Sequence, residues 1–225
     1  MVKSGFLIFF LLVFLIFPVN SQEISTAARY LESVSEVYGG IRDYEAHVVI
    51  RSGNTDMVGS LIYLSPSFLR IDFTRPAEQV IVFNGELLTV YLPEYRATLN
   101  QNISPSRRGA TMATAQGLNL LRRNYVPSFV TGPDPVPLDA SLPDPVVKIR
   151  LARRSISEGF REIIISVSAD TKLIRRIEGR SIADTNVQFD FTNIRTNLGI
   201  PELRFVYDSP SSAYNYNNFL FRDTD

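Results

Sequence analysis

The sequence predicts a mainly β chain, in which about ten short antiparallel strands form one curved or barrel-like sheet beside an N-terminal helix. Three observations support this class. Apolar runs of strand length alternate with turn residues over most of the 225-residue chain. The connections between the runs are too short for crossover helices, which indicates antiparallel neighbours. Several runs are apolar at consecutive positions, so both faces of the sheet need a cover.

The N-terminal residues have the pattern of a cleavable signal peptide, which we expect over residues 1–21. Lys3 precedes an apolar run from Phe6 to Phe17, which is shorter than the about 20 residues of a membrane span. We expect cleavage after Ser21, export, and a single domain over residues 22–225. The sequence contains no cysteine, so we expect neither disulfides nor a lipid anchor on a cysteine.

The first half of the domain is predicted to contain one helix and six strands. The helix runs from Glu23 to Tyr38, with apolar residues at three- and four-residue steps, and Gly39-Gly40 ends it. Asn84-Gly85 is a strong hairpin signal between the fourth and fifth strands. The strands are predicted over residues 44–51, 57–64, 68–74, 79–83, 86–92 and 95–101.

The second half begins with an interruption of the strand pattern between residues 102 and 145. A helix is predicted from Gly109 to Tyr125, and the proline-rich stretch 127–145 is expected to form an extended surface loop. The tail from Ser209 to Asp225 is polar, and we expect it to have low order. Further strands are predicted over residues 147–151, 160–168, 173–179, 186–194 and 203–207.

Charge and motifs exclude several classes of function. The formal net charge is zero, with 23 basic and 23 acidic residues, which argues against a nucleic-acid partner. The only histidine, His47, lies in the middle of a predicted strand, and no nucleophile, nucleotide or metal motif occurs. We therefore expect no enzyme, no metal and no cofactor, although two carboxylates that meet in space stay open.

Arginine pairs are the most distinctive charged feature. They lie at residues 107–108, 122–123, 153–154 and 175–176. They fit either solvated ends of strands and helices or a docking surface for an acidic partner or anionic headgroups.

The apolar strands are the best candidate for a functional surface. A two-residue loop at Asn84-Gly85 would place Phe83 opposite Glu86 and Ile81 opposite Leu88. One face then carries Ile81, Phe83, Leu88, Val90 and Leu92. Such a face fits either a closed barrel filled by its own side chains or a barrel open enough to accept an apolar ligand.

The order of motifs resembles the LolA family, the periplasmic carriers of outer-membrane lipoproteins. The matching features are a turn at Ser65-Pro66, the strand start Phe68-Leu69-Arg70-Ile71, the break at Arg75-Pro76, the aliphatic strand Val80-Ile81-Val82, the turn Asn84-Gly85, and Val90-Tyr91 before Pro93. The resemblance extends from Glu23 to about Asn215.

This resemblance implies an unclosed antiparallel β-barrel, with short helices as a lid over an apolar cavity. It implies acylated lipoproteins or lipids as cargo, delivered by an inner-membrane lipoprotein-releasing ABC transporter to an unknown outer-membrane acceptor, and a monomer that transports them through the periplasm. The implied lid residues are Met112, Leu118 and Leu121. The implied cavity wall is Leu61, Tyr63, Leu69, Ile71, Phe73, Ile81, Phe83, Leu88, Val90 and Leu92. The alternative is a regulatory module of the same fold that senses lipids or lipoproteins.

One departure concerns the gating of the lid. Family members carry an arginine that latches the lid, where this chain has Ser65. A serine offers a weaker hydrogen bond than a guanidinium. Arg70 or Arg75 is the expected substitute.

Overall fold

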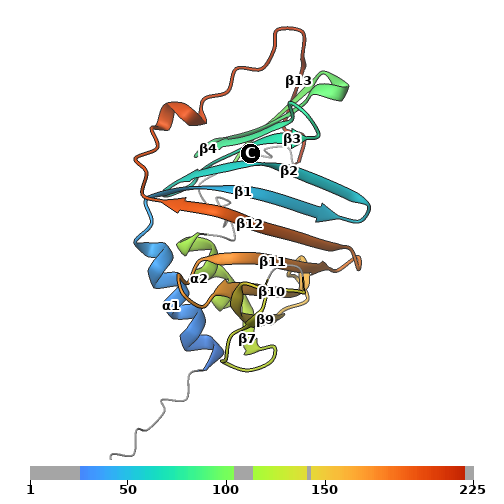
Figure 1. The fold of residues 1–225 in the computed structure, drawn as a ribbon. Helices are drawn as coiled ribbons and strands as arrows, with labels where there is room; N and C mark the ends of the chain where they lie inside the picture. Colours follow the sequence, from blue (N-terminus) through green and yellow to red (C-terminus); the bar gives the residue numbers. More distant parts are fainter. Residues whose placement is uncertain (1–25, 104–113, 141–142, 221–225) are drawn as a thin grey trace, which may run out of the picture.

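A computed structural model describes residues 26–103, 114–140 and 143–220 of the chain. These residues form one large sheet, two α-helices and two short 3₁₀ helices (Figure 1). The helical elements are α1 (Ala27–Gly39), η1 (Pro93–Tyr95), α2 (Ala115–Asn124) and η3 (Glu202–Phe205). The strands are β1 (Asp43–Ser52), β2 (Thr55–Leu64), β3 (Phe68–Arg75), β4 (Val80–Asn84), β5 (Leu87–Leu92), β6 (Ala97–Asn102), β7 (Tyr125–Phe129), β8 (Val136–Pro137), β9 (Pro145–Arg153), β10 (Phe160–Ser168), β11 (Ile174–Ser181), β12 (Asn186–Thr196) and β13 (Tyr214–Asn217).

The sheet is open within the described residues. Its strand order is β13-β6-β5-β4-β3-β2-β1-β12-β11-β10-β9-β7, and β8 pairs with β9 beside this path. Every pairing is antiparallel except that of β13 with β6. The terminal strands β13 and β7 do not pair with each other, so the prediction of a mainly β, unclosed antiparallel barrel is confirmed.

Helix α1 begins and ends at capping residues that the sequence supplies. The Thr26 side chain accepts a hydrogen bond from the Arg29 amide at 3.2 Å, and the backbone ends the helix at Gly40. Leu31, Val34 and Tyr38 lie on one face and are buried against the sheet. Within the described ranges, neither α-helix has the length and hydrophobicity that a bilayer span needs.

The main core lies between one face of the sheet and the two α-helices. Figure 1 shows α1 and α2 together beside β7 and β9–β11, with β3 and β4 farther away. Strand β1 contributes Tyr44, Ala46, Val48 and Ile50, and their partners on neighbouring strands point to the same face. We call this side the inner face.

A segment that we call the strap, residues 197–213, follows β12 and covers the outer face of β2–β5. Phe205 is 1% exposed and packs with Ile62, Val80 and Val82. The strap then leads to β13, which pairs with β6 and forms the edge of the sheet. The outer face of these strands is thus covered by a segment distant in sequence.

Two predictions about this C-terminal region are wrong. The strand predicted over residues 203–207 is instead the 3₁₀ helix η3, which turns Phe205 toward the outer face. The low order predicted from Ser209 does not hold over residues 209–220, because β13 pairs with β6 and the Leu220 amide donates to the Gln101 side chain at 3.0 Å.

The middle of the chain departs from the prediction in three respects. The described part of the predicted helix starts at Ala115, and residues 104–113 lie outside the described residues, as does the predicted signal peptide. The proline-rich stretch is only partly a surface loop, since β7 and β8 pair with β9 and Leu138 is 3% exposed. The described residues form thirteen strands, more than the about ten predicted. The additional strands β7, β8 and β13 are short, and their sequences have no clear apolar–polar alternation.

Candidate functional site: the inner face of strands β3 to β6

The sheet register brings the ten predicted wall residues onto the inner face. Cross-strand partners point to the same side of a sheet. Ile71 pairs with Leu61 and Ile81, and Ile81 pairs with Val90. Leu69 likewise pairs with Tyr63 on one neighbouring strand and with Phe83 on the other, and Phe83 pairs with Leu88. Phe73 and Leu92 share this face because they lie two residues beyond Ile71 and Val90.

The predicted register of the β4–β5 hairpin is nevertheless wrong by two residues. Phe83 pairs with Leu88, where Glu86 was expected. The Asn84 side chain accepts hydrogen bonds from the amides of Glu86 at 3.1 Å and Leu87 at 2.9 Å, which makes the turn longer than two residues. Because a shift of two keeps every side chain on its face, the assignment of faces is unchanged.

Exposure divides these ten residues into two groups. Leu61, Tyr63, Ile71 and Phe73 are 4–7% exposed and belong to the main core. The other six are only partly buried: Leu69, Ile81, Phe83, Leu88, Val90 and Leu92. Leu69 and Ile81 lie at the margin of the core, and the remaining four lie beyond it. The inner face therefore changes from packed core to partly exposed apolar surface between β2 and β5.

The position of the helices explains this change. Helices α1 and α2 pack against each other and against β7, at the opposite end of the sheet from β5 and β6 (Figure 1). Leu118 and Leu121, the predicted lid residues on α2, are 0% and 8% exposed and lie in the main core. Met112 lies outside the described residues.

Sequence reasoning missed one apolar residue of this surface. Leu99 pairs with Val90 and is partly exposed on the inner face of β6. The alternation of side chains along a strand, which places Val90 on the inner face, also places Leu99 there when it is extended across the turn between β5 and β6. Its neighbour on the same face, Gln101, is fully buried at the edge of the sheet.

At the turn that contains Ser65, the Ser65 amide donates to the carbonyl of Arg42 at 2.7 Å, a contact with the arginine backbone and not with its guanidinium. The Tyr63 hydroxyl donates to the Pro66 carbonyl at 3.1 Å. Burial raises the pKa of Tyr63, and a hydrogen bond with the Ser65 side chain opposes the rise. Arg70 is not a substitute latch, since it lies on the outer face, pairs with Asp72 and donates to the Arg204 carbonyl of the strap at 3.0 Å.

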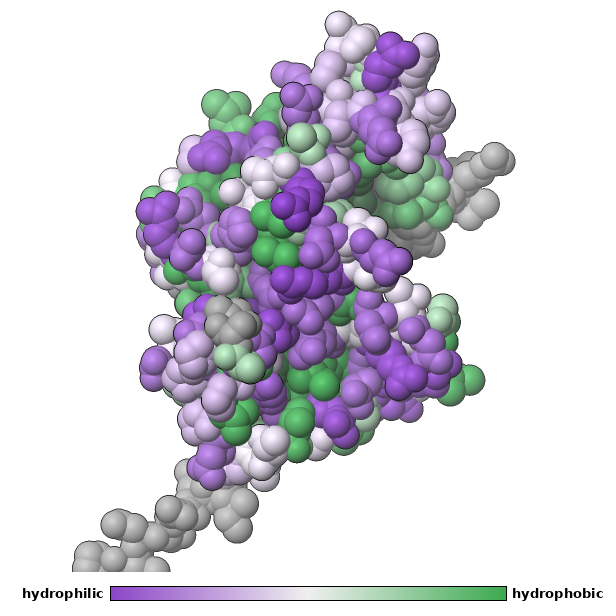
Figure 2. Space-filling model, turned by 45° about the vertical axis from the view of Figure 1, so that its right-hand side comes forward, coloured by the Kyte–Doolittle hydropathy of each residue, from purple (hydrophilic) through white to green (hydrophobic). Residues whose placement is uncertain are grey.

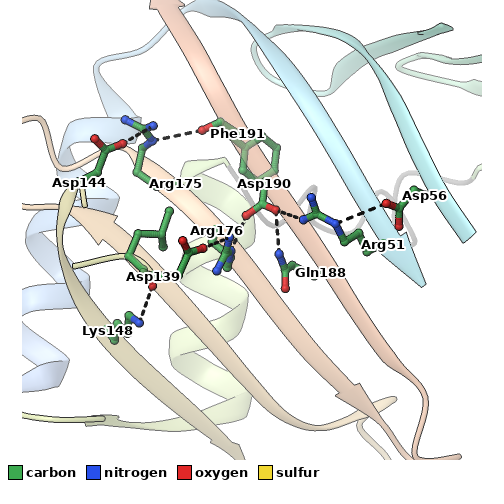
Figure 3. Close-up of polar contacts among 11 residues, drawn as sticks. Arg51, Asp56, Asp139, Asp144, Lys148, Arg175, Arg176, Gln188, Asp190 and Phe191 are labelled. Atoms are coloured by element: carbon green, nitrogen blue, oxygen red, sulfur yellow. Dashed lines mark hydrogen bonds and ion pairs between the residues drawn. The ribbon is translucent and has the colours of Figure 1, made fainter. Parts of the chain in front are cut away.

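The outer face of β1, β11 and β12 is polar instead. Figure 3 shows the Asp190 carboxylate between Arg51 and Arg176, with the Gln188 amide donating to it at 2.7 Å. Arg176 also contacts Asp139 at 2.8 Å. The charges in this network are paired with one another, so the network presents no free reactive group among these residues.

The described part of the chain offers no metal centre, because no three of its histidine, aspartate and glutamate side chains gather as ligands. In the view of Figure 2, hydrophilic side chains cover most of the surface and hydrophobic ones occur in separate groups. The partly exposed apolar residues of β3–β6 therefore remain the candidate site.

Sequence and structure comparisons give different results. No known family model and no curated protein sequence matches the chain. The solved structure of an uncharacterized conserved protein from Thermus thermophilus aligns over 84% of this chain and 98% of its own, with a TM-score of 0.55 and 12% identity.

Two further solved structures align with most of the chain. In the Pseudomonas aeruginosa MucA/MucB complex, the alignment covers 84% of this chain and 62% of that chain, with a TM-score of 0.51 and 13% identity. A LolA superfamily protein from Nitrosomonas europaea aligns over 81% of this chain and 98% of its own, with a TM-score of 0.41 and 12% identity.

The likeness to the Thermus and Pseudomonas structures concerns the fold alone. Together with the open sheet and the helices on its inner face, it defines the class of this protein as an open β half-barrel. At the level of the fold, the open sheet is the unclosed antiparallel barrel that the sequence resemblance implied.

Proposed function

We propose that the protein is a carrier that binds the acyl chains of lipoproteins or lipids on the inner face of β3–β6. One observation carries the proposal: this face presents partly exposed apolar side chains, whereas the outer face of the same strands is covered by the strap. A sheet face of this kind needs an apolar cover, and acyl chains have the shape and chemistry to supply it.

The energetics of acyl transfer favour such a carrier. Each CH₂ group removed from water is worth about 0.8 kcal/mol, so a free diacyl or triacyl anchor does not cross an aqueous compartment unaided. A face made of side chains from several strands can bind the chains by apolar contact alone, without a directional contact for each carbon. Transfer to an acceptor of higher affinity then needs no energy source.

The finer parts of the proposal follow from the sequence resemblance. We propose that residues 1–21 direct export and that residues 22–225 act as one monomeric, non-catalytic domain in the periplasm. The domain would take lipoproteins from an inner-membrane lipoprotein-releasing ABC transporter and move them to the outer membrane. Helix α2 would act as the lid, with Leu118 and Leu121 on the side that the main core now buries.

A second candidate function is a sensing module that binds a regulatory protein. The observation that favours it is the likeness to MucB, which was solved in complex with MucA. The alignment covers 62% of the matched chain in that complex. A carrier yields bound acylated protein on purification, whereas a sensing module yields a stable complex with one regulatory protein.

The first test is to purify the exported protein from a two-membraned host and identify bound molecules by mass spectrometry. Acylated polypeptides would support the carrier, and phospholipid alone would limit the function to lipid binding. A protein that carries no lipid and also fails to take up an apolar fluorescent probe would refute the proposed acyl-binding face.

Adjacent leucines on β5 provide a matched test of the face itself. Leu88 lies on the inner face and Leu87 on the outer face, and both are partly buried. Leu88→Glu should weaken probe uptake at least about tenfold, because it places a carboxylate among apolar chains. Leu87→Glu should leave uptake within about twofold of the wild type. Equal effects of the two substitutions would show that binding does not use the inner face.

A further inference from the structure

The structure separates three of the four arginine pairs of the sequence into two kinds, and the pair at residues 107–108 lies outside the described residues. Arg175 and Arg176 are neutralised by aspartates: Arg175 Nη2 lies 2.7 Å from Asp144 Oδ2, and Arg176 contacts Asp139 and Asp190 (Figure 3). The charges of this pair are therefore balanced within the fold.

Both arginines of the pair at residues 122–123 and one arginine of the pair at 153–154 meet at a single place. Arg122 and Arg123 lie in the last turn of α2, and Arg154 directly follows β9. All three line one pocket of about 350 Å³, which we call the arginine pocket. Its other lining residues are Ala28, Asn119 and Pro127. The pocket thus lies where α1, α2 and β7 come together (Figure 1).

The charges of the arginine pocket are only partly balanced. Arg122 Nη2 lies 2.8 Å from Glu32 Oε1. Arg154 Nε donates to the Tyr125 carbonyl at 3.2 Å, which supplies no counter-charge. Within the described residues, neither Arg123 nor Arg154 has an ion pair. Among the described residues, two guanidinium groups in one concave site therefore lack a carboxylate partner.

The helix dipole explains part of this arrangement. Cations in the last turn of a helix are favourable, which accounts for Arg122 and Arg123 on α2. It does not account for Arg154, which comes from the end of a strand and lines the same pocket. The convergence of cations from two elements on one pocket points to an anion.

We propose that the arginine pocket binds a phosphate group, carried either by an anionic lipid headgroup or by a soluble phosphate compound. The planar guanidinium fork matches phosphate oxygens and can bind two of them at once. The Asn119 side chain adds an amide donor to the same lining. This inference does not depend on the acyl-binding face of β3–β6, because it uses different elements.

The test compares two double variants of the full chain with the same loss of charge. Arg123→Gln/Arg154→Gln removes both unpaired cations of the pocket. Arg42→Gln/Arg96→Gln removes two exposed arginines that have no ion pair in the described residues. Binding is measured to vesicles of phosphatidylcholine with and without phosphatidylglycerol, and to inorganic phosphate by calorimetry.

We expect the wild type and the control variant to bind phosphatidylglycerol vesicles more tightly than phosphatidylcholine vesicles, with a steep dependence on salt. The pocket variant should lose roughly 30-fold in affinity, at about 1 kcal/mol for each arginine. Binding of inorganic phosphate without a preference for phosphatidylglycerol vesicles would support the phosphate site and indicate that a soluble compound supplies the phosphate. Equal losses in both variants, or no binding of either probe by the wild type, would overturn the proposal.

Discussion

Substitution of Phe205 by alanine tests whether the strap is an integral part of the fold. Phe205 is 1% exposed, and its ring centroid lies 5.4 Å from that of Phe68 on β3. Removal of a fully buried phenylalanine costs about 3–5 kcal/mol in transfer and cavity free energy. For a chain of this size, each kcal/mol corresponds to about 2–4 °C in Tm, so the expected decrease is about 6–20 °C.

Leu203 is the matched control, because it belongs to the same 3₁₀ helix and is 77% exposed. Leu203→Ala should change the free energy of unfolding by less than about 0.5 kcal/mol. Both values are measured by urea denaturation followed by circular dichroism. If Phe205→Ala costs no more than Leu203→Ala, the strap detaches without unfolding the sheet, and the outer face would not depend on it.

Two further predictions concern the main core and its neighbouring backbone. Gly59→Ala should destabilise the protein by about 1–3 kcal/mol, because the new Cβ would lie 2.6 Å from the Asp72 carbonyl oxygen, whereas Gly39→Ala meets no atom within 4 Å and serves as the control. Burial raises the pKa of Tyr38 and Tyr44 above the ordinary value near 10. Their contribution to stability is therefore complete below about pH 10 and is lost as the pH rises toward the folded-state values. Denaturation curves at pH 8 and pH 11 should show this loss, and Tyr44→Phe should reduce it; an equal loss in the variant would contradict the assignment.

The sequence predicted the β1–β5 region well because its information there is local. Alternation along a strand fixes which residues share a face, and a register error of two residues at Asn84 left the faces of Ile81 and Leu88 unchanged. The ten wall residues could thus be placed on one face without knowledge of the register. The sequence could not predict which of the ten are buried and which are partly exposed, since this depends on where α1 and α2 pack against the sheet.

The C-terminal region could not be predicted because its contacts are remote. Arg70 holds the strap through the carbonyls of Arg204 and Val206, and the Asp43 carboxylate accepts from the Leu198 amide at 2.6 Å. No local pattern in residues 197–217 indicates these partners, which lie more than a hundred residues earlier. The polar composition of Tyr214–Asn217 suggested low order, yet an edge strand needs only backbone partners, and β6 supplies them.

The strap also bears on where a ligand can bind. Strands β4 and β5 carry apolar residues on both faces, so a single layer of these strands would expose apolar surface on two sides. The strap covers the outer side by packing Phe205 against Ile62 and Val82, and Arg70 ties this cover to β3. Ile71 and Phe73 of β3 are buried in the main core, whereas the inner apolar residues of β4 and β5 lie far from α1 and α2 and stay partly open. Under the proposed function, an intact strap is therefore a condition for selective ligand binding, and loosening it should open a second, competing apolar face.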